Sequence, residues 1–114
     1  MAIARDAYDG DDTEWSRDLA RRYNSEFADL NGFRIPGALL KKVPVELMFR
    51  YNFVPLEETQ DGKLAIAIAD PSQLLMIDEI KLLLNRNVVT KVSTLKQISD
   101  TLTRTEQAQR DKYE

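Results

Sequence analysis

Cysteine and histidine are both missing from this 114-residue sequence. Without cysteine, the chain forms no disulfide and offers no thiolate ligand to a metal ion. Without histidine, it lacks the commonest general base and the commonest zinc ligand. Nucleophilic catalysis by a Ser–His or Cys–His pair is therefore excluded, and we expect no catalytic residue and no metal site.

Glycine is also scarce, and its four copies are scattered at positions 10, 32, 37 and 62. Neither the Gly-rich loop that cradles nucleotide phosphates nor the dinucleotide fingerprint occurs, so we expect no bound cofactor. The acidic stretch from Asp9 to Glu14 hints at calcium, but an EF-hand loop counted from Asp9 requires Gly at its sixth and Glu at its twelfth position. The sequence has Glu14 and Ala20 there, which favours a solvated acidic tail.

Long apolar runs are missing too. The longest, from Leu64 to Ala69, has six residues, whereas roughly 20 are needed to cross a bilayer. The first twelve residues lack the apolar core of a signal peptide. The 16 Lys+Arg and 19 Asp+Glu residues give a net charge of −3, while nucleic-acid-binding domains usually carry a basic stripe. We expect neither membrane insertion nor a nucleic-acid partner.

The first half of the chain reads as helices. Residues 13–24 predict a helix with Thr13 as its N-cap and one apolar stripe, formed by Trp15, Leu19 and Tyr23. A turn follows at residues 31–32, an Asn-Gly pair. Pro36 and Pro44 then each predict the first position of a short helix, because proline fits where no intrahelical N–H bond is lost.

Three short strands are predicted in the second half. Residues 63–69 alternate aliphatic residues with alanines, so this strand is apolar on both faces and belongs in the middle of a covered sheet. Its alanine face allows a helix to approach closely. The strand before it contains Pro55, which indicates a sheet edge or a break in pairing, and Asp61-Gly62 predicts the turn between the two. Residues 88–92 form the third strand.

Two further helices flank that third strand. Asp70 predicts the N-cap and Pro71 the first position of a helix that Asn85 or Asn87 closes, with Ser72 as the alternative N-cap. Its outward residues are predicted to be Asp78, Glu79 and Lys81, and its buried stripe to be Met76, Ile77, Ile80, Leu83 and Leu84. Thr94 and Gln97 predict a capping box for the last helix.

These elements predict an α+β fold in the order α-α-α-β-β-α-β-α, with a small mixed three-stranded sheet packed with helices. The first two strands are expected to be antiparallel, and the crossover between the second and third predicts a parallel pair. The expected organisation is a disordered acidic tail over residues 1–12, a domain over 13–104, and a polar helix or linker over 105–114 that leads toward a further, absent part.

No carboxylate pair suggests acid–base catalysis, which requires two carboxylates that face one substrate. The simpler interpretation is that Glu57-Glu58 lies at the edge of a loop and that Asp78-Glu79 lies on the solvent-exposed face of a helix. An arginine cluster and a run of leucines remain as candidate partner contacts. The residues predicted to bind a partner are Arg17, Arg21, Arg22, Lys81 and Leu82.

From Ile35 onward, the order of signals resembles the N-terminal domain of the ATPases of type II secretion and type IV pilus assembly, the GspE/MshE-type N-terminal domain. The similarity covers roughly residues 18–104, and the Ala-Asp-Pro turn at 69–71 is its most specific piece. Residues 85–87 are Asn-Arg-Asn where the family often has Gly. The matching segments are 35–36, 44–51, 53–56, 64–71, 77–80, 88–92 and 95–102, preceded by a lead-in at 18–30 that is also similar to the family.

The resemblance implies a non-catalytic docking and regulatory domain on the cytoplasmic side of the inner membrane. It implies a GspL-type platform protein as partner, a hexameric parent with ATP and Mg²⁺ only in its absent C-terminal domain, and a monomeric fragment. An alternative is a domain that senses cyclic di-GMP, although the tandem R-L-G-x-x-L motifs of such members do not occur here. A third hypothesis is a small hydrolase or transferase, which requires a deep pocket with convergent polar groups.

Overall fold

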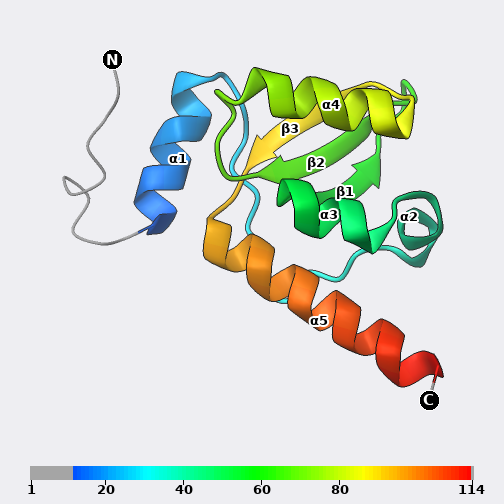
Figure 1. Cartoon of the computed structure of the whole chain (residues 1–114). Helices are drawn as coiled ribbons and strands as arrows, with labels where there is room; N and C mark the ends of the chain where they lie inside the picture. The colour runs from blue at the N-terminus through cyan, green and yellow to red at the C-terminus, as the bar shows by residue number, and fades with distance from the viewer. Residues whose placement is uncertain (1–11, 114) are drawn as a thin grey trace.

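The structure, a computed structural model, describes residues 12–113. The predicted tail over residues 1–12 therefore lies outside the described residues, except for Asp12, which begins the first helix. Figure 1 shows the elements, which are α1 (Asp12–Arg22), α2 (Gly37–Lys42), α3 (Val45–Tyr51), β1 (Val54–Glu58), β2 (Leu64–Ile68), α4 (Leu74–Leu84), β3 (Val88–Val92) and α5 (Leu95–Tyr113). The predicted element order is confirmed.

The sheet has the strand order β1-β2-β3. β1 pairs with β2 antiparallel and β2 pairs with β3 parallel, which confirms the predicted mixed sheet and the α+β class. All five residues of β2 are buried. A strand that is apolar on both faces is stable only where both faces are covered, and the central position of β2 meets that requirement.

Pro55 lies on an edge strand, and the pairing register shifts between Pro55 and Glu57. The two predicted alternatives, a sheet edge and a break in pairing, are thus both present. Each position tolerates a proline because it has no N–H to donate to the ladder. The hairpin closes with Thr59 N–H donating to Lys63 O at 2.8 Å. Gly62 has a φ of 82°, a conformation that glycine adopts without a steric penalty.

The predicted starts of α1, α2, α3 and α4 are wrong by one or more residues. Pro36 and Pro44 have ψ angles of 139° and 135°, so both are extended and stand just before α2 and α3. Thr13 lies inside α1, because that helix already begins at Asp12. Asparagine ends α3 and α4 as expected from its tolerance of the left-handed region, with φ angles of 52° at Asn52 and 53° at Asn85.

α4 starts at Leu74, later than the Asp-Pro pair predicts. The Asp70 carboxylate accepts bonds from Ser72 N–H at 2.9 Å and from the Ser72 hydroxyl at 2.6 Å, and Gln73 N–H donates to Asp70 O at 3.3 Å. These bonds close a separate turn before the helix. Asp70 therefore caps a turn rather than the helix itself.

The capping box of α5 is half confirmed. Gln97 N–H donates to Thr94 Oγ1 at 3.0 Å, as the motif predicts. The Gln97 side chain does not close the box but accepts from Leu30 N–H at 2.9 Å and from the Ser93 hydroxyl at 3.1 Å. It thereby ties the segment before α2 to the start of α5, across 67 residues of sequence.

The buried face of α1 also differs from the predicted stripe. Ser16 and Ala20 are the buried residues, whereas Trp15 and Leu19 are half-buried and Tyr23 is exposed. Small residues allow α1 to approach β3, and the following segment pairs with β3 through a parallel bridge between Phe27 and Val92. The core lies between the helices and β2, and its largest fully buried members are Phe53, Leu30, Met48, Leu64, Ile66, Ile68, Ile80, Ile98 and Leu102.

Glu58 joins three separate parts of the chain. Lys42 Nζ donates to Glu58 Oε1 at 2.7 Å and Arg86 Nη2 donates to Oε2 at 3.3 Å, while the same Arg86 atom donates to Gly62 O at 2.9 Å. The hydrogen bonds and charge of Lys42 and Arg86 lower the pKa of the Glu58 carboxyl below its ordinary 4.5.

We expect Glu58→Gln to flatten the acid end of the stability profile. Because the pKa of Glu58 is lower in the folded than in the unfolded chain, its contribution is present above the unfolded pKa and is lost as pH falls through the folded pKa. Thermal unfolding from neutral pH to about pH 3 measures this. Glu57→Gln, at the exposed neighbour, is the matched control, and equal profiles for the two variants would contradict the prediction.

Candidate functional site

The outer face of α4 carries four leucines that are more than half exposed. The exposed fractions are 82% for Leu75 and 80% for Leu82, and 68% and 52% for Leu74 and Leu83. Leu75 and Leu82 are seven residues apart, so they lie on the same side of the helix. These four residues, Leu74, Leu75, Leu82 and Leu83, are called the leucine face below. An apolar patch of this kind is typical of an interaction surface.

The opposite side of α4 accounts for this exposure. Ile77 and Ile80 are buried in the core, and Met76 and Leu84 pack against it. One stripe of the helix is thus enough to attach it to the domain. The exposed Asp78 and Glu79 stand between the leucines along the chain.

Glu79 also acts on Tyr51, the last residue of α3. Hydrogen bonding to the Glu79 carboxylate raises the pKa of the Tyr51 hydroxyl, with burial acting in the same direction. The core contacts of Ile77 and Ile80 fix the helix that carries the leucine face.

The two predicted α4 contacts differ in their exposure. Leu82 is exposed as the predicted contact requires, but Lys81 is half-buried rather than outward. Leu83 belongs to the exposed side and not to the buried stripe. The leucine run from 82 to 84 thus supplies two exposed residues and one that packs on the core.

The arginine cluster lies on α1, away from the C-terminal end of α4 that carries Lys81 and Leu82 (Figure 1). The Arg17 guanidinium stands 4.5 Å from the centre of the Phe27 ring, a cation–π distance. Arg21 Nη2 forms an ion pair with Asp18 at 2.7 Å. Arg22 is exposed. The two predicted sets of contacts do not form one site.

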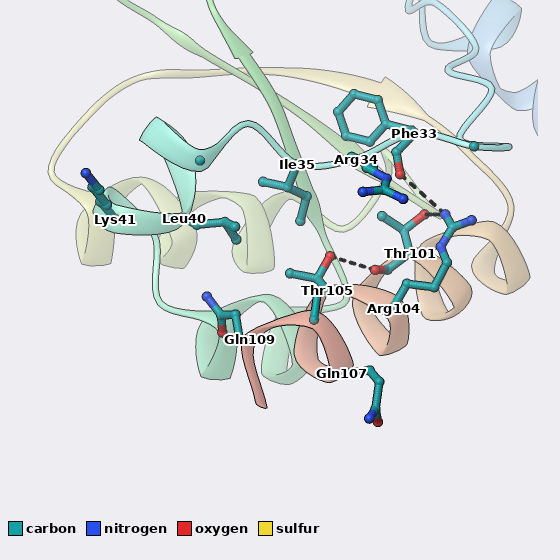
Figure 2. Close-up of a pocket in the computed structure, with 13 residues that line it drawn as sticks. Phe33, Arg34, Ile35, Leu40, Lys41, Thr101, Arg104, Thr105, Gln107 and Gln109 are labelled. Carbon is teal, nitrogen blue, oxygen red and sulfur yellow. Dashed lines mark hydrogen bonds between the residues drawn. The ribbon is translucent and has the colours of Figure 1, made fainter. Parts of the chain in front are cut away.

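A groove of about 890 Å³ runs between residues 32–41 and the C-terminal half of α5. Figure 2 shows its lining: Arg34 and Arg104 lie at one end, Lys41 lies at the other, and Ile35, Leu40 and Thr105 lie between them. None of the described residues that line the groove is Asp or Glu, although the whole chain has a net charge of −3. This groove is called the cationic groove below.

Arg104 is held in place at the edge of the cationic groove. Its Nη2 donates to Phe33 O at 3.4 Å and to Thr101 Oγ1 at 3.2 Å. Both acceptors are neutral. Arg34, Lys41 and Arg104 form no ion pair with any side chain that the structure describes.

Sequence reasoning did not identify Leu74 and Leu75 or the three cations of the groove. The run Gln-Leu-Leu-Met at 73–76 has more leucines than one buried stripe needs, which was the available signal for the first pair. The groove joins Phe33 to Arg104, 71 residues apart, and no local pattern marks such a pair.

The lining of the cationic groove and the described acidic side chains bear on catalysis and on metal binding. The lining of the cationic groove has no carboxylate, tyrosine or histidine to transfer a proton. Among the described side chains, no group of three or more His, Cys, Asp or Glu residues is placed to hold a metal ion. No helix within residues 12–113 is long and apolar enough to span a membrane.

Comparison with known proteins gives a consistent result. The model of the MshEN domain family matches residues 16–112. The type IV pilus assembly ATPase PilB of Myxococcus xanthus (strain DK1622) is 27% identical over 86 residues, which cover 75% of this chain and 15% of PilB. The chain thus spans only a small part of the length of that curated relative.

Two solved structures share the fold. The structure of MshE with cdg matches with a TM-score of 0.71 and 20% identity, over 82% of this chain and 67% of that one. The N-terminal domain of XpsE matches with a TM-score of 0.68 and 18% identity, over 82% and 65% of the two chains. At these identities the likeness establishes a common architecture.

Proposed function

This chain belongs to the MshEN domain family, and from that membership we propose that it is the N-terminal docking and regulatory domain of a type II secretion or type IV pilus assembly ATPase. In this proposal it links the motor to the platform protein of the inner membrane, a GspL-type partner, on the cytoplasmic side. The sequence similarity to the pilus assembly ATPase PilB and the shared fold of the XpsE N-terminal domain support it.

The leucine face is the observation that carries this proposal. Burying one leucine contributes about 1.5–3 kcal/mol relative to leaving it exposed, so a domain with no partner gains nothing from four exposed leucines on one helix. A protein partner that covers them recovers that free energy. Lys81 on α4 remains a predicted contact beside the leucine face, and Arg17, Arg21 and Arg22 on α1 remain predicted contacts at a separate place on the domain.

Catalysis is assigned to other parts of the parent protein. The groups that hold ATP and Mg²⁺ are expected outside this chain, which has no P-loop sequence. The hexameric state is likewise expected of the full-length parent, and a monomeric state of this domain alone. The domain is thereby held peripherally at the membrane through its partner rather than by inserting into it.

Leu75→Ser together with Leu82→Ser is expected to weaken binding to the cytoplasmic part of the platform protein by roughly tenfold or more, because both side chains lie at the centre of the leucine face. Isothermal titration of the purified domain measures the affinity. The folded state is expected to change little, since both residues are exposed.

Leu95→Ser is the matched control, because Leu95 is half-exposed on α5 and outside the leucine face. It should leave the affinity unchanged. Equal affinity for the double variant and the control, or no binding of any candidate platform protein by the folded domain, contradicts the proposal.

A second candidate function is the sensing of cyclic di-GMP. The observation that favours it is the fold shared with MshE, whose structure was solved with cdg. The absence of any R-L-G sequence in this chain ranks it below docking. Calorimetry with cyclic di-GMP separates the two functions, since saturable heat at micromolar ligand would reverse this order.

A further inference from the structure

We propose that the cationic groove is a second binding site, separate from the leucine face, and that it takes an acidic peptide segment with a bulky apolar side chain between its carboxylates. This goes beyond docking through α4, because the groove is built from α2, the segment before it and α5. The ligand is defined by its chemistry, and the argument rests on charge, on the apolar lining and on the spacing of the cations.

The charge of the groove is opposite to that of the chain. Arg34, Lys41 and Arg104 line it, while the chain as a whole has a net charge of −3. Elsewhere in this domain, several lysine and arginine side chains form ion pairs. Examples are Lys42 with Glu58 and Lys96 with Asp100, each at 2.7 Å. Three cations that pair with none of the described acidic side chains, around one concave surface, attract an anionic ligand.

Arg104 is the best-placed of the three. Its contacts with Phe33 O and Thr101 Oγ1 use one of its terminal nitrogens. A guanidinium has five N–H donors in a planar fork. The remaining donors of a side chain held in this way are available for a carboxylate, with less loss of side-chain entropy on binding.

The middle of the groove is apolar. Ile35 is buried in the core, and Phe33 and Leu40 pack against it from the groove side. Gly32 and Gly37 also line the groove, and apart from the adjoining backbone no heavy atom lies within 4 Å of the position that a Cβ would take at either one. There is room for a leucine-sized or phenylalanine-sized side chain above this apolar surface.

The spacing of the cations favours a peptide over a phosphate ligand. Figure 2 shows Arg34 and Arg104 at one end and Lys41 at the other, with the apolar surface between them. A phosphate group needs donors that converge on one point, whereas two separated charges around an apolar centre match a segment of the pattern acidic–apolar–acidic. The half-buried Gln109 carboxamide on the same wall suits a peptide backbone, which offers both N–H and C=O groups.

The cationic groove lies beside the C-terminal half of α5, the last helix of the domain. The half of α5 that forms one wall is polar and continues to Tyr113, away from the sheet (Figure 1). Within the described chain, the Arg104–Phe33 bond ties this wall to the segment before α2. A peptide bound across the groove bridges the same two parts and holds α5 against the domain.

The test uses the whole chain and a fluorescein-labelled peptide in which aspartates and glutamates flank one leucine and one phenylalanine. Saturable binding is expected in fluorescence anisotropy, with NMR amide shifts centred on Gly32, Gly37 and Thr105. Arg34→Ala with Lys41→Ala should weaken it roughly fivefold to tenfold, because each exposed ion pair is worth up to about 1 kcal/mol. The same peptide with lysine in place of each acid should not bind.

Lys96→Ala with Arg110→Ala is the matched control. It removes the same charge from exposed positions on α5 that do not line the groove, and it should bind the peptide as the unsubstituted chain does. The Leu75→Ser, Leu82→Ser variant should also bind it normally, which separates this proposal from the docking proposal.

Three results would overturn the proposal. One is equal affinity of the groove variant and its charge control. Another is no saturable shift at millimolar peptide. The third is a groove that responds to cyclic di-GMP or to phosphatidylserine vesicles and not to the acidic peptide, which would assign the cations to a phosphate ligand or to a lipid surface.

Discussion

Replacing Phe53 with alanine is expected to lower the free energy of unfolding by about 3–5 kcal/mol. Phe53 is fully buried, directly before β1, and is among the largest buried side chains of the core. Its removal forfeits the free energy of burying the ring and leaves a cavity that the surrounding side chains fill only in part. Since a domain of this size is stable by about 5–15 kcal/mol, a large share of its stability depends on this one ring.

Phe49 provides the matched control. It is the same residue type four positions earlier, on α3, and it is 38% exposed. Phe49→Ala should cost much less than Phe53→Ala, because the ring keeps part of its contact with water in the folded domain. Urea unfolding of both variants measures the difference, and two equal midpoint shifts would show that the core is not placed as described.

The central strand and its neighbours were predictable because their signals are local. The alternation from Leu64 to Ile68 determines that β2 is covered on both faces, and the length of the βαβ connection determines its parallel pairing with β3. Pro55 marked the edge strand because it has no N–H to donate. In each case one residue type permits few conformations, so the sequence alone restricts the structure.

Helix starts were less predictable because several side chains compete for the same backbone groups. Asp70 binds Ser72 and not the first turn of α4, and Gln97 binds Leu30 and not its own helix cap. The second case depends on a partner 67 residues away, which no window of local sequence contains. A capping motif thus indicates that a helix end is near in the sequence. Tertiary contacts then determine which residue forms that end.

The leucine face and the cationic groove also differ in whether a local sequence signal marks them. The leucine run of α4 gave a local excess of apolar residues, so Leu82 was identifiable, while the choice between Leu83 and Leu84 depended on the rotation of the helix against the core. The cationic groove gave no such excess. Arg34, Lys41 and Arg104 are ordinary surface cations in the sequence, and only the packing of α5 beside residues 32–41 brings them to one concave surface.

The second large effect is expected from Ala67→Leu, which should lower the free energy of unfolding by about 1–3 kcal/mol through overpacking. Ala67 is fully buried in β2, with Val54 and Lys91 as its partners in register on either side. α5 brings its backbone within 8 Å of both β1 and β2. The extra side-chain atoms therefore have to displace a helix or a neighbouring strand.

Ala38→Leu on α2 is the control for the added volume, because Ala38 is exposed and leucine has nearly the same helix propensity as alanine. It should leave the unfolding midpoint almost unchanged. A neutral Ala67→Leu would mean that the alanines of β2 face spare volume, and then the close approach of a helix to this strand would no longer explain why small residues alternate with large ones along it.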